Sequence, residues 1–172
     1  GHMGYALAGI ATGTTAGFKS SIFYISIYVV MNIGAFSCLF LMKKDGEYKE
    51  SISDLSGISK KNPLLALSLL IILFSLAGIP PLGGFFAKFY VFSSVLEQKM
   101  YFLAIIGLLT TVISAVYYLK IIKTIYFDEN KLSFDLVNNK IINFTIFLSC
   151  TLLLTFFLYP SVLNEIISSL LI

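Results

Sequence analysis

Long uncharged runs, separated by short charged segments, dominate the pattern of apolar and polar residues along the chain. A helix needs about 20 apolar residues to cross the hydrocarbon core of a bilayer. The pattern predicts a partial span over 3–18, complete spans over 20–42, 63–96, 100–126 and 141–160, and a short interfacial tail over 161–172. The predicted fold class is therefore an all-α polytopic membrane protein with four complete transmembrane helices and a partial N-terminal one.

The opening segment 3–18 is apolar but short, and Gly9, Gly13 and Gly17 recur in it at every fourth residue. Such a stripe of small residues lets membrane helices approach each other closely. The segment is therefore expected to be the later part of a truncated span. Because no positively charged region precedes it, no cleavable signal peptide is expected.

The span over 63–96 is too long for one straight helix, and prolines interrupt it near its middle. Pro80 and Pro81 donate no backbone N–H, so the carbonyls of Leu76 and Ala77 lose their helical partners. The sequence predicts a broken helix whose break comprises Gly78, Pro80, Pro81, Gly83 and Gly84. Lipid cannot satisfy freed backbone groups, so we expect the break to face protein or a hydrated cavity in the middle of the membrane.

Lys88 follows this break by about one helical turn and is the only charged residue in the middle of a predicted span. A buried ammonium costs about 3 kcal/mol or more unless water, dipoles or a partner compensates. Since burial favours the neutral amine, Lys88 is the main candidate for a proton relay near neutral pH. The alternative is a structural cation that reaches an interface or binds the carbonyl end of the preceding helix segment.

His2 is a second, tentative candidate for the relay, because imidazole titrates near physiological pH. If Gly1 to Met3 were left over from removal of a tag, His2 would have no role. Three polar residues of the predicted spans are candidates to line a polar path: Asn32, Thr111 and Tyr117. Groups of this kind more often form hydrogen bonds between packed helices, which is the structural alternative.

Composition and motifs exclude several classes of protein. Hydrophobic residues make up 58% of the chain and charged residues 12%, too few charges for the surface of a soluble domain. The chain has no phosphate-binding glycine loop, no cluster of Cys and His ligands and no Ser, His and Asp constellation, so no redox centre, cofactor or metal site is expected in it. Cys38 and Cys150 lie in apolar runs and receive no chemical role. Twelve lysines without arginine give no support to nucleic-acid binding.

Lysines in the loops predict the orientation. The connections 43–61 and 120–140 carry nine lysines, whereas Lys19 and Lys99 alone lie in the alternate connections. Cytoplasmic loops hold the excess of positive charge, so the two lysine-rich connections are expected on the cytoplasmic side and the C-terminus on the opposite side.

The residues from Leu76 to Phe92, LAGIPPLGGFFAKFYVF, closely resemble the broken-helix signature of the antiporter-like, proton-pumping membrane subunits of respiratory complex I. Three more segments fall in register with that family: Gly1 to Ala8, Asn32 to Phe36, and Tyr117 to Lys120. The resemblance thus covers the whole chain and argues that Gly1 to Met3 is native. Lys-Phe-Tyr at 88–90 favours one branch of the family, because relatives in another branch carry an acidic residue there.

This resemblance implies that residues 1–172 are the C-terminal third of a subunit with about fourteen transmembrane helices in two inverted repeats. Lys88 would be the terminal lysine of the second half-channel, which takes a proton from a neighbouring lysine and releases it outward. The implied partners are other membrane subunits of complex I, the missing N-terminal part of the same subunit and the lipid bilayer.

The resemblance also implies a subunit of an NADH:quinone oxidoreductase, a proton-pumping translocase, in the bacterial inner membrane or else the mitochondrial inner membrane. NADH, FMN, iron–sulfur clusters and quinone would all bind in partner subunits and none in this chain. One alternative is a subunit of a multisubunit cation/proton antiporter, which shares the proline break and its lysine. Another is a non-pumping structural fragment.

Overall fold

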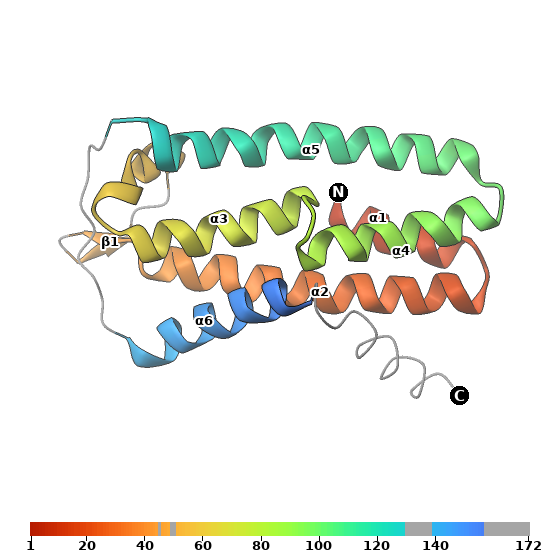
Figure 1. Ribbon diagram of the computed structural model, residues 1–172, viewed down its shortest axis with the longest axis horizontal. Coiled ribbons are helices and arrows are strands. Elements are labelled where there is room, and N and C mark those ends of the chain that lie inside the picture. The colour runs from red at the N-terminus through yellow and green to blue at the C-terminus, as the bar shows by residue number, and fades with distance from the viewer. Residues whose placement is uncertain (45, 49–50, 130–138, 157–172) are drawn as a thin grey trace.

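The structure is a computed structural model that describes residues 1–44, 46–48, 51–129 and 139–156. The elements, in chain order, are α1 His2–Ala11, α2 Thr15–Phe40, β1 Lys43–Lys44, β2 Glu47–Tyr48, the 3₁₀ turns η1 Ile52–Leu55 and η2 Ile58–Lys60, α3 Pro63–Ala77, α4 Gly83–Glu97, α5 Tyr101–Phe127 and α6 Lys140–Thr155. They form an elongated bundle in which α3 and α4 lie end to end, with α2 on one side and α5 on the other (Figure 1).

Helices account for most of the described residues, as the apolar runs predicted, and β1 and β2 form one short antiparallel hairpin. Among the described residues, α2 and α5 are each long and apolar enough to cross a membrane. The 3₁₀ turns of Ile52–Lys60 and α3 form a further apolar pair that is bent by 119°. The all-α membrane fold is therefore confirmed, whereas the number of four complete spans stays a prediction. The predicted tail over 161–172 and the end of the span over 141–160 lie outside the described residues.

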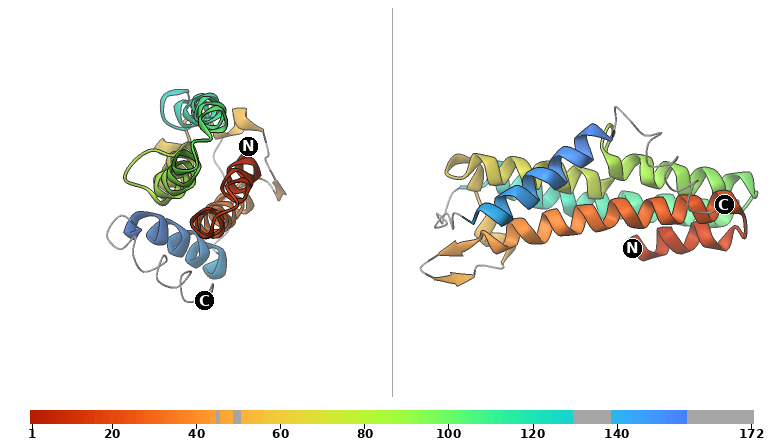
Figure 2. Two further views of the ribbon diagram at one scale, coloured as in Figure 1. Left: turned by 90° about the vertical axis from the view of Figure 1, so that its right-hand side faces the viewer. Right: turned by 90° about the horizontal axis from the view of Figure 1, so that it is seen from below.

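The structure divides the N-terminal region differently from the prediction. Helix α1 ends at Ala11, Gly13 adopts a left-handed conformation with φ of 65°, and α2 begins at Thr15. The Thr14 side chain caps α2 by accepting a hydrogen bond from the Gly17 N–H at 3.1 Å. The expectation of one helix over 3–18 is wrong because a glycine and a capping threonine favour a turn at this point. Helix α1 folds back along α2, as the view from below shows (Figure 2).

Two glycines of the predicted stripe, Gly9 and Gly17, lie at the contact between α1 and α2 rather than along one helix. A Cβ atom on Gly17 would overlap the carbonyl oxygen of Gly9, and a Cβ on Gly9 would collide with the Ser21 hydroxyl. Because the helices approach so closely, the Ser21 hydroxyl donates to the Ala6 carbonyl at 2.7 Å. This hydrogen bond holds α1 against α2.

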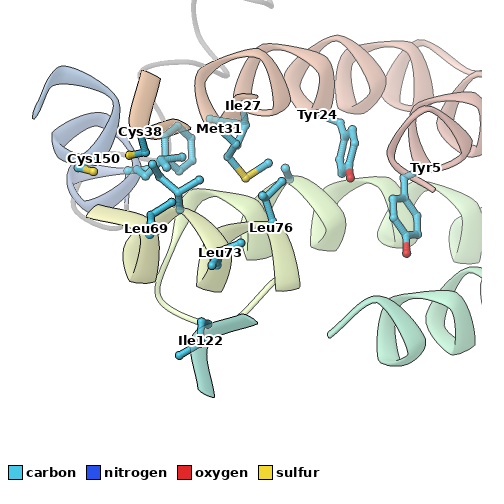
Figure 3. Close-up of a cluster of buried hydrophobic side chains, with 14 of the residues drawn as sticks. Tyr5, Tyr24, Ile27, Met31, Cys38, Leu69, Leu73, Leu76, Ile122 and Cys150 are labelled. Atoms are coloured by element: carbon cyan, nitrogen blue, oxygen red, sulfur yellow. The ribbon is translucent and has the colours of Figure 1, made fainter. Parts of the chain in front are cut away.

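An apolar core fills the space between α2, α3 and α6 (Figure 3). The inward face of α2 repeats at helical spacing through Tyr24, Ile27, Met31 and Cys38, all of which are buried. Its partners on α3 include Leu69, Leu73 and Leu76, and Cys150 joins them from α6. Cys38 and Cys150 are free thiols, which pack here as small apolar groups.

Helices α2 and α5 both end at the same end of the bundle, so the two lysine-rich connections begin there (Figure 1). A hydrogen bond of 3.0 Å from the Gly57 N–H to the Thr124 carbonyl ties the first connection to α5. Lys19 and Lys99 belong to the opposite end. This geometry agrees with the loop pattern, and the assignment of the shared end to the cytoplasm stays a prediction.

The close approach of α1 and α2 gives a testable consequence. We expect Gly17→Ala to destabilise the full-length subunit by about 1 to 3 kcal/mol, because the new methyl group must displace the Gly9 backbone. Gly4→Ala is the matched control, since a Cβ atom at Gly4 meets no atom within 4 Å. Thermal unfolding of the two variants in detergent measures the difference. Equal midpoints for both would show that the two helices separate without cost.

Candidate functional site

The site begins where α3 ends. Gly78 adopts a left-handed conformation with φ of 85°, and its N–H donates to the Ser75 carbonyl at 3.0 Å. The next N–H, that of Ile79, donates back to the Phe74 carbonyl at 3.0 Å. This pair of bonds is the Schellman arrangement, in which a glycine stops a helix. It leaves the carbonyls of Leu76 and Ala77 without backbone partners, as the prolines predicted.

Helix α4 restarts directly against the end of α3. The Gly84 N–H, one of the unsatisfied donors of its first turn, donates to the Ser75 hydroxyl oxygen at 3.0 Å. A Cβ atom on Gly84 would overlap the Ser75 carbonyl, so glycine alone permits this approach. Pro80 and Pro81, joined by a cis peptide bond, carry the chain between the two helices.

The Lys88 side chain folds back from α4 onto the end of α3. Its Nζ donates to the carbonyls of Leu76 at 3.0 Å and Ala77 at 3.1 Å, the same two groups that the prolines set free. Lys88 is only 5% exposed, and no acidic side chain pairs with it among the described residues. Gly78 makes room for it, since a Cβ atom there would lie 3.1 Å from Nζ. The ammonium thus binds the negative end of the α3 dipole.

The freed carbonyls of the break therefore face protein, and Lys88 itself satisfies them, whereas Pro80 and Pro81 are exposed. The expectation of a hydrated cavity at the break stays a prediction. A cavity of about 720 Å³ lies between α3 and α6, where its lining is largely apolar and includes Leu65, Ile71, Ile146 and Leu154. The backbone groups that prompted the expectation are bonded by an ammonium, so water is not required to satisfy them.

A cluster of aromatic side chains lies beside Lys88, on the side toward α1 and α5. The Lys88 Nζ lies 5.3 Å from the centre of the Tyr5 ring, within the range of a cation–π contact. The Tyr5 ring lies 5.7 Å from that of Tyr24 and 6.2 Å from that of His2. Figure 3 shows Tyr5 and Tyr24 next to each other at one end of the apolar core.

His2 lies at the centre of this cluster. Its Nδ1 is 2.8 Å from the Tyr24 hydroxyl oxygen, and its Nε2 is 2.9 Å from the Tyr118 hydroxyl oxygen. The imidazole ring stacks on Tyr28, with 4.7 Å between ring centres and 18° between planes. His2 therefore joins α1 to both α2 and α5. Among the described residues, no chain of hydrogen bonds connects His2 to Lys88, which approach each other across the Tyr5 ring.

The three candidates for a polar lining have different surroundings in the structure. Thr111 joins the cluster, because its hydroxyl donates to the Tyr5 hydroxyl oxygen at 2.9 Å. Asn32 donates to the Tyr28 carbonyl of its own helix at 2.9 Å. Tyr117 is half exposed, and its ring packs against that of Tyr118 at 4.8 Å. Asn32 and Tyr117 thus make contacts within their own helices, whereas the bond of Thr111 to Tyr5 joins two helices, as the structural alternative describes.

Sequence reasoning missed Tyr5, the residue that lies between Lys88 and His2. It placed Tyr24 and Tyr118 among the many polar residues of the spans that could line a path, without indicating that they hold the imidazole. The spacing of His2 and Tyr5, one helical turn apart on α1, places them on one face, and that was an available signal. No local feature of the sequence indicated that α1 folds back against α4 and α5.

A bundle of apolar helices, with one helix broken in its middle and a buried charge at the break, is the architecture of a membrane transporter domain. The chain belongs to the family described as NADH:quinone oxidoreductase/Mrp antiporter transmembrane domains, whose pattern matches residues 1–114. His2, the break and Lys88 all lie within the matched part.

Similar proteins carry the name NADH-quinone oxidoreductase subunit N. The protein of Pelagibacter ubique is 61% identical over 168 residues, which is 98% of this chain and 36% of that protein. The protein of Rhodospirillum rubrum is 43% identical, over 96% of this chain and 34% of its own length. Lys-Phe-Tyr at 88–90 favoured the branch of subunit N, and these similar proteins carry that name.

The fold is similar to that of one chain of respiratory complex I from Thermus thermophilus, solved with bound Aureothin. The TM-score is 0.80 at 25% identity, covering 94% of this chain and 36% of that chain. This chain therefore spans about a third of the length of the relatives that it matches.

The contact across the break can be tested by removing one hydroxyl. We expect Ser75→Ala to destabilise the full-length subunit by about 1 to 3 kcal/mol, because it leaves the buried Gly84 N–H without an acceptor. Ser26→Ala is the matched control, since the Ser26 hydroxyl is exposed and bonds the Ile22 carbonyl of its own helix. Thermal unfolding in detergent measures both. A Ser75→Ala midpoint equal to that of Ser26→Ala would contradict the assigned bond.

Proposed function

We propose that this chain is the C-terminal part of a proton-translocating membrane subunit of a bacterial NADH:quinone oxidoreductase. In this proposal, electron transfer from NADH to quinone takes place in partner subunits, which hold the FMN and the iron–sulfur clusters. This chain contributes a proton site in the inner membrane. The observation that carries the proposal is the buried Lys88, which is bonded to two backbone carbonyls and lacks an acidic partner among the described residues.

The surroundings of Lys88 are compatible with both of its protonation states. An ammonium has three N–H donors, of which two bind the carbonyls of Leu76 and Ala77 and the third is free beside the Tyr5 ring. A neutral amine keeps two N–H donors and gains a lone pair. Both carbonyls therefore stay bonded when the proton leaves. A carboxylate partner would instead have fixed the charge.

The direction of proton movement follows from the place of this chain in the longer subunit. Lys88 would accept a proton from a neighbouring lysine outside this chain and release it toward the outer side. Charge changes that accompany quinone reduction elsewhere in the complex would drive both steps. Lys88 and His2 are the proton-bearing groups that this chain supplies, and the cluster of Tyr5, Tyr24 and Tyr118 positions them.

A cation/proton antiporter subunit is the second candidate, because the description of the matched family includes Mrp antiporters. The names of the relatives favour the oxidoreductase. The proteins that copurify with the subunit distinguish the two candidate functions, since the oxidoreductase subunit would purify with the other subunits of complex I. A purely structural fragment is the remaining alternative, and it predicts no effect of Lys88 on pumping.

Two substitutions of Lys88 separate a proton site from a structural cation. Lys88→Arg keeps the positive charge and the N–H donors for Leu76 and Ala77, but a guanidinium does not release its proton at physiological pH. Lys88→Met removes the donors as well. We expect both variants to lower NADH-driven acidification of inverted membrane vesicles by about tenfold or more when present in the full-length subunit. We also expect Lys88→Met to destabilise the subunit further.

The matched control is Lys61→Met, because Lys61 is exposed in the loop before α3. NADH oxidation by ferricyanide and the amount of assembled complex must match the wild type, so that lost pumping is not lost assembly. If Lys88→Arg pumps like Lys61→Met, Lys88 is a structural cation and the proposed function fails. Lost pumping in an assembled Lys88→Arg complex supports it.

A further inference from the structure

The cavity between α3 and α6 is a groove that opens on the outer surface of the bundle. Leu65 and Cys150 line it and are buried, whereas Leu67 and Phe147 line it and are exposed. The Cys150 Sγ lies 3.9 Å from the Ser68 carbonyl oxygen, so the two helices meet at the bottom of the groove. An apolar space of about 720 Å³ loses packing contacts if it is left empty. In a bilayer, an apolar ligand is expected to fill it.

The groove is about as long as one leaflet of a bilayer is deep. It begins at Leu64 on α3 and Asn143 on α6, in the first turns of the two helices, and it reaches Ile71 and Leu154. At about 1.5 Å per residue these stretches measure about 10 and 17 Å, against about 15 Å for half of the hydrocarbon core. A transmembrane helix of a partner needs a contact surface of about twice this length. One lipid acyl chain fits within it.

Positive charge surrounds the end at which the groove begins. Helices α3 and α6 both start at the end of the bundle where the lysine-rich connections begin (Figure 1), and neither has an acidic residue in its first turn. The positive ends of both helix dipoles therefore lie there without a compensating carboxylate.

Two lysines add full charges at the same end. Lys140 lies one turn before Asn143 on the same face of α6, and Lys60 precedes Leu64 by four residues. Both lysines are exposed, and neither forms an ion pair among the described residues. The exposed Asn143 amide adds a hydrogen-bond donor. An anionic group beside an apolar chain matches this distribution of charge.

We propose that the groove between α3 and α6 binds one acyl chain of an anionic phospholipid, whose phosphate lies near Lys60, Lys140 and Asn143. Basic side chains at the membrane surface attract anionic headgroups, and the apolar groove adds the selection for a lipid tail. The groove ends at Ile71, more than one turn before the carbonyl of Leu76 that binds Lys88. The proposal therefore does not depend on the proposed function, and a pumping defect is not needed to test it.

Photo-crosslinking of the assembled complex in lipid vesicles identifies the occupant. One sample contains phosphatidylglycerol with a diazirine in its acyl chain, and the other contains phosphatidylcholine with the same label. Mass spectrometry measures the label on the peptides of α3 and α6. We expect phosphatidylglycerol to label the lining residues about fivefold more than phosphatidylcholine does.

Two results on the wild-type complex overturn the proposal. Equal labelling by the two lipids excludes selection of the anionic headgroup. Label on other membrane peptides of the complex but none on the lining residues excludes a lipid as the occupant, and crosslinks from these residues to another subunit would then identify a protein in its place.

Reversal of charge tests the position of the headgroup. We expect Lys60→Glu combined with Lys140→Glu to abolish the preference for phosphatidylglycerol. Lys120→Glu combined with Lys123→Glu is the matched control, because these two lysines lie toward the same end of the bundle on α5, which does not line the groove. An unchanged preference in the first double variant contradicts the assigned headgroup position.

Filling of the groove tests the position of the acyl chain. Leu154 and Leu152 both lie on α6 and are 47% and 46% exposed, but Leu154 lines the groove and Leu152 does not. We expect Leu154→Trp to lower the labelling several-fold, because the indole occupies the inner end of the groove, and Leu152→Trp to leave it unchanged. The amount of assembled complex must match the wild type in both. Equal labelling in the two variants overturns the acyl-chain site.

Discussion

The contact on which the rest of the site depends is that of one ammonium with two backbone carbonyls. Consecutive prolines remove the helical partners of Leu76 and Ala77, and in lipid such free carbonyls would each cost several kcal/mol. Lys88 returns along α4 to bind both of them. The break and the lysine therefore stabilise each other, since the freed carbonyls gain a hydrogen-bond donor and the buried charge gains two carbonyl dipoles. Neither would be tolerated in the membrane alone.

Glycines at the break allow this contact because the two helix ends must nearly touch. Gly84 lets the first turn of α4 meet the Ser75 carbonyl, and the left-handed Gly78 both ends α3 and leaves space for the lysine side chain. The same principle holds α1 in place, where Gly9 and Gly17 remove the side chains between the helices. Membrane helices have little hydrophobic force to drive their association, so backbone contact of this kind contributes much of their packing.

The break, its freed carbonyls and the buried lysine could be predicted from the sequence, because proline chemistry is local and identifies the affected carbonyls by number. The alternative in which Lys88 binds the end of the preceding helix segment describes the geometry that the structure shows. The course of α1 could not be predicted, because Gly13 fits a packing stripe and a turn equally well. Tyr5 was missed for the same reason, since its contact with Lys88 exists only after α1 folds back.

Enclosure of the site is asymmetric, and this constrains any path for protons. Lys88 and Tyr24 are closed off by α1, α2 and the break, whereas Tyr118 lies on α5, the least covered helix. The exposed hydroxyls of Thr110 and Ser114 donate hydrogen bonds to backbone carbonyls of α5 itself, so their hydrogens need no further acceptor. Tyr118 lies against Tyr117, whose ring is 4.8 Å away on the same helix and whose half-exposed side chain reaches the surface of α5. Lipid cannot satisfy a hydroxyl at that surface, so we expect protein or water to cover α5 at Tyr117 and Tyr118.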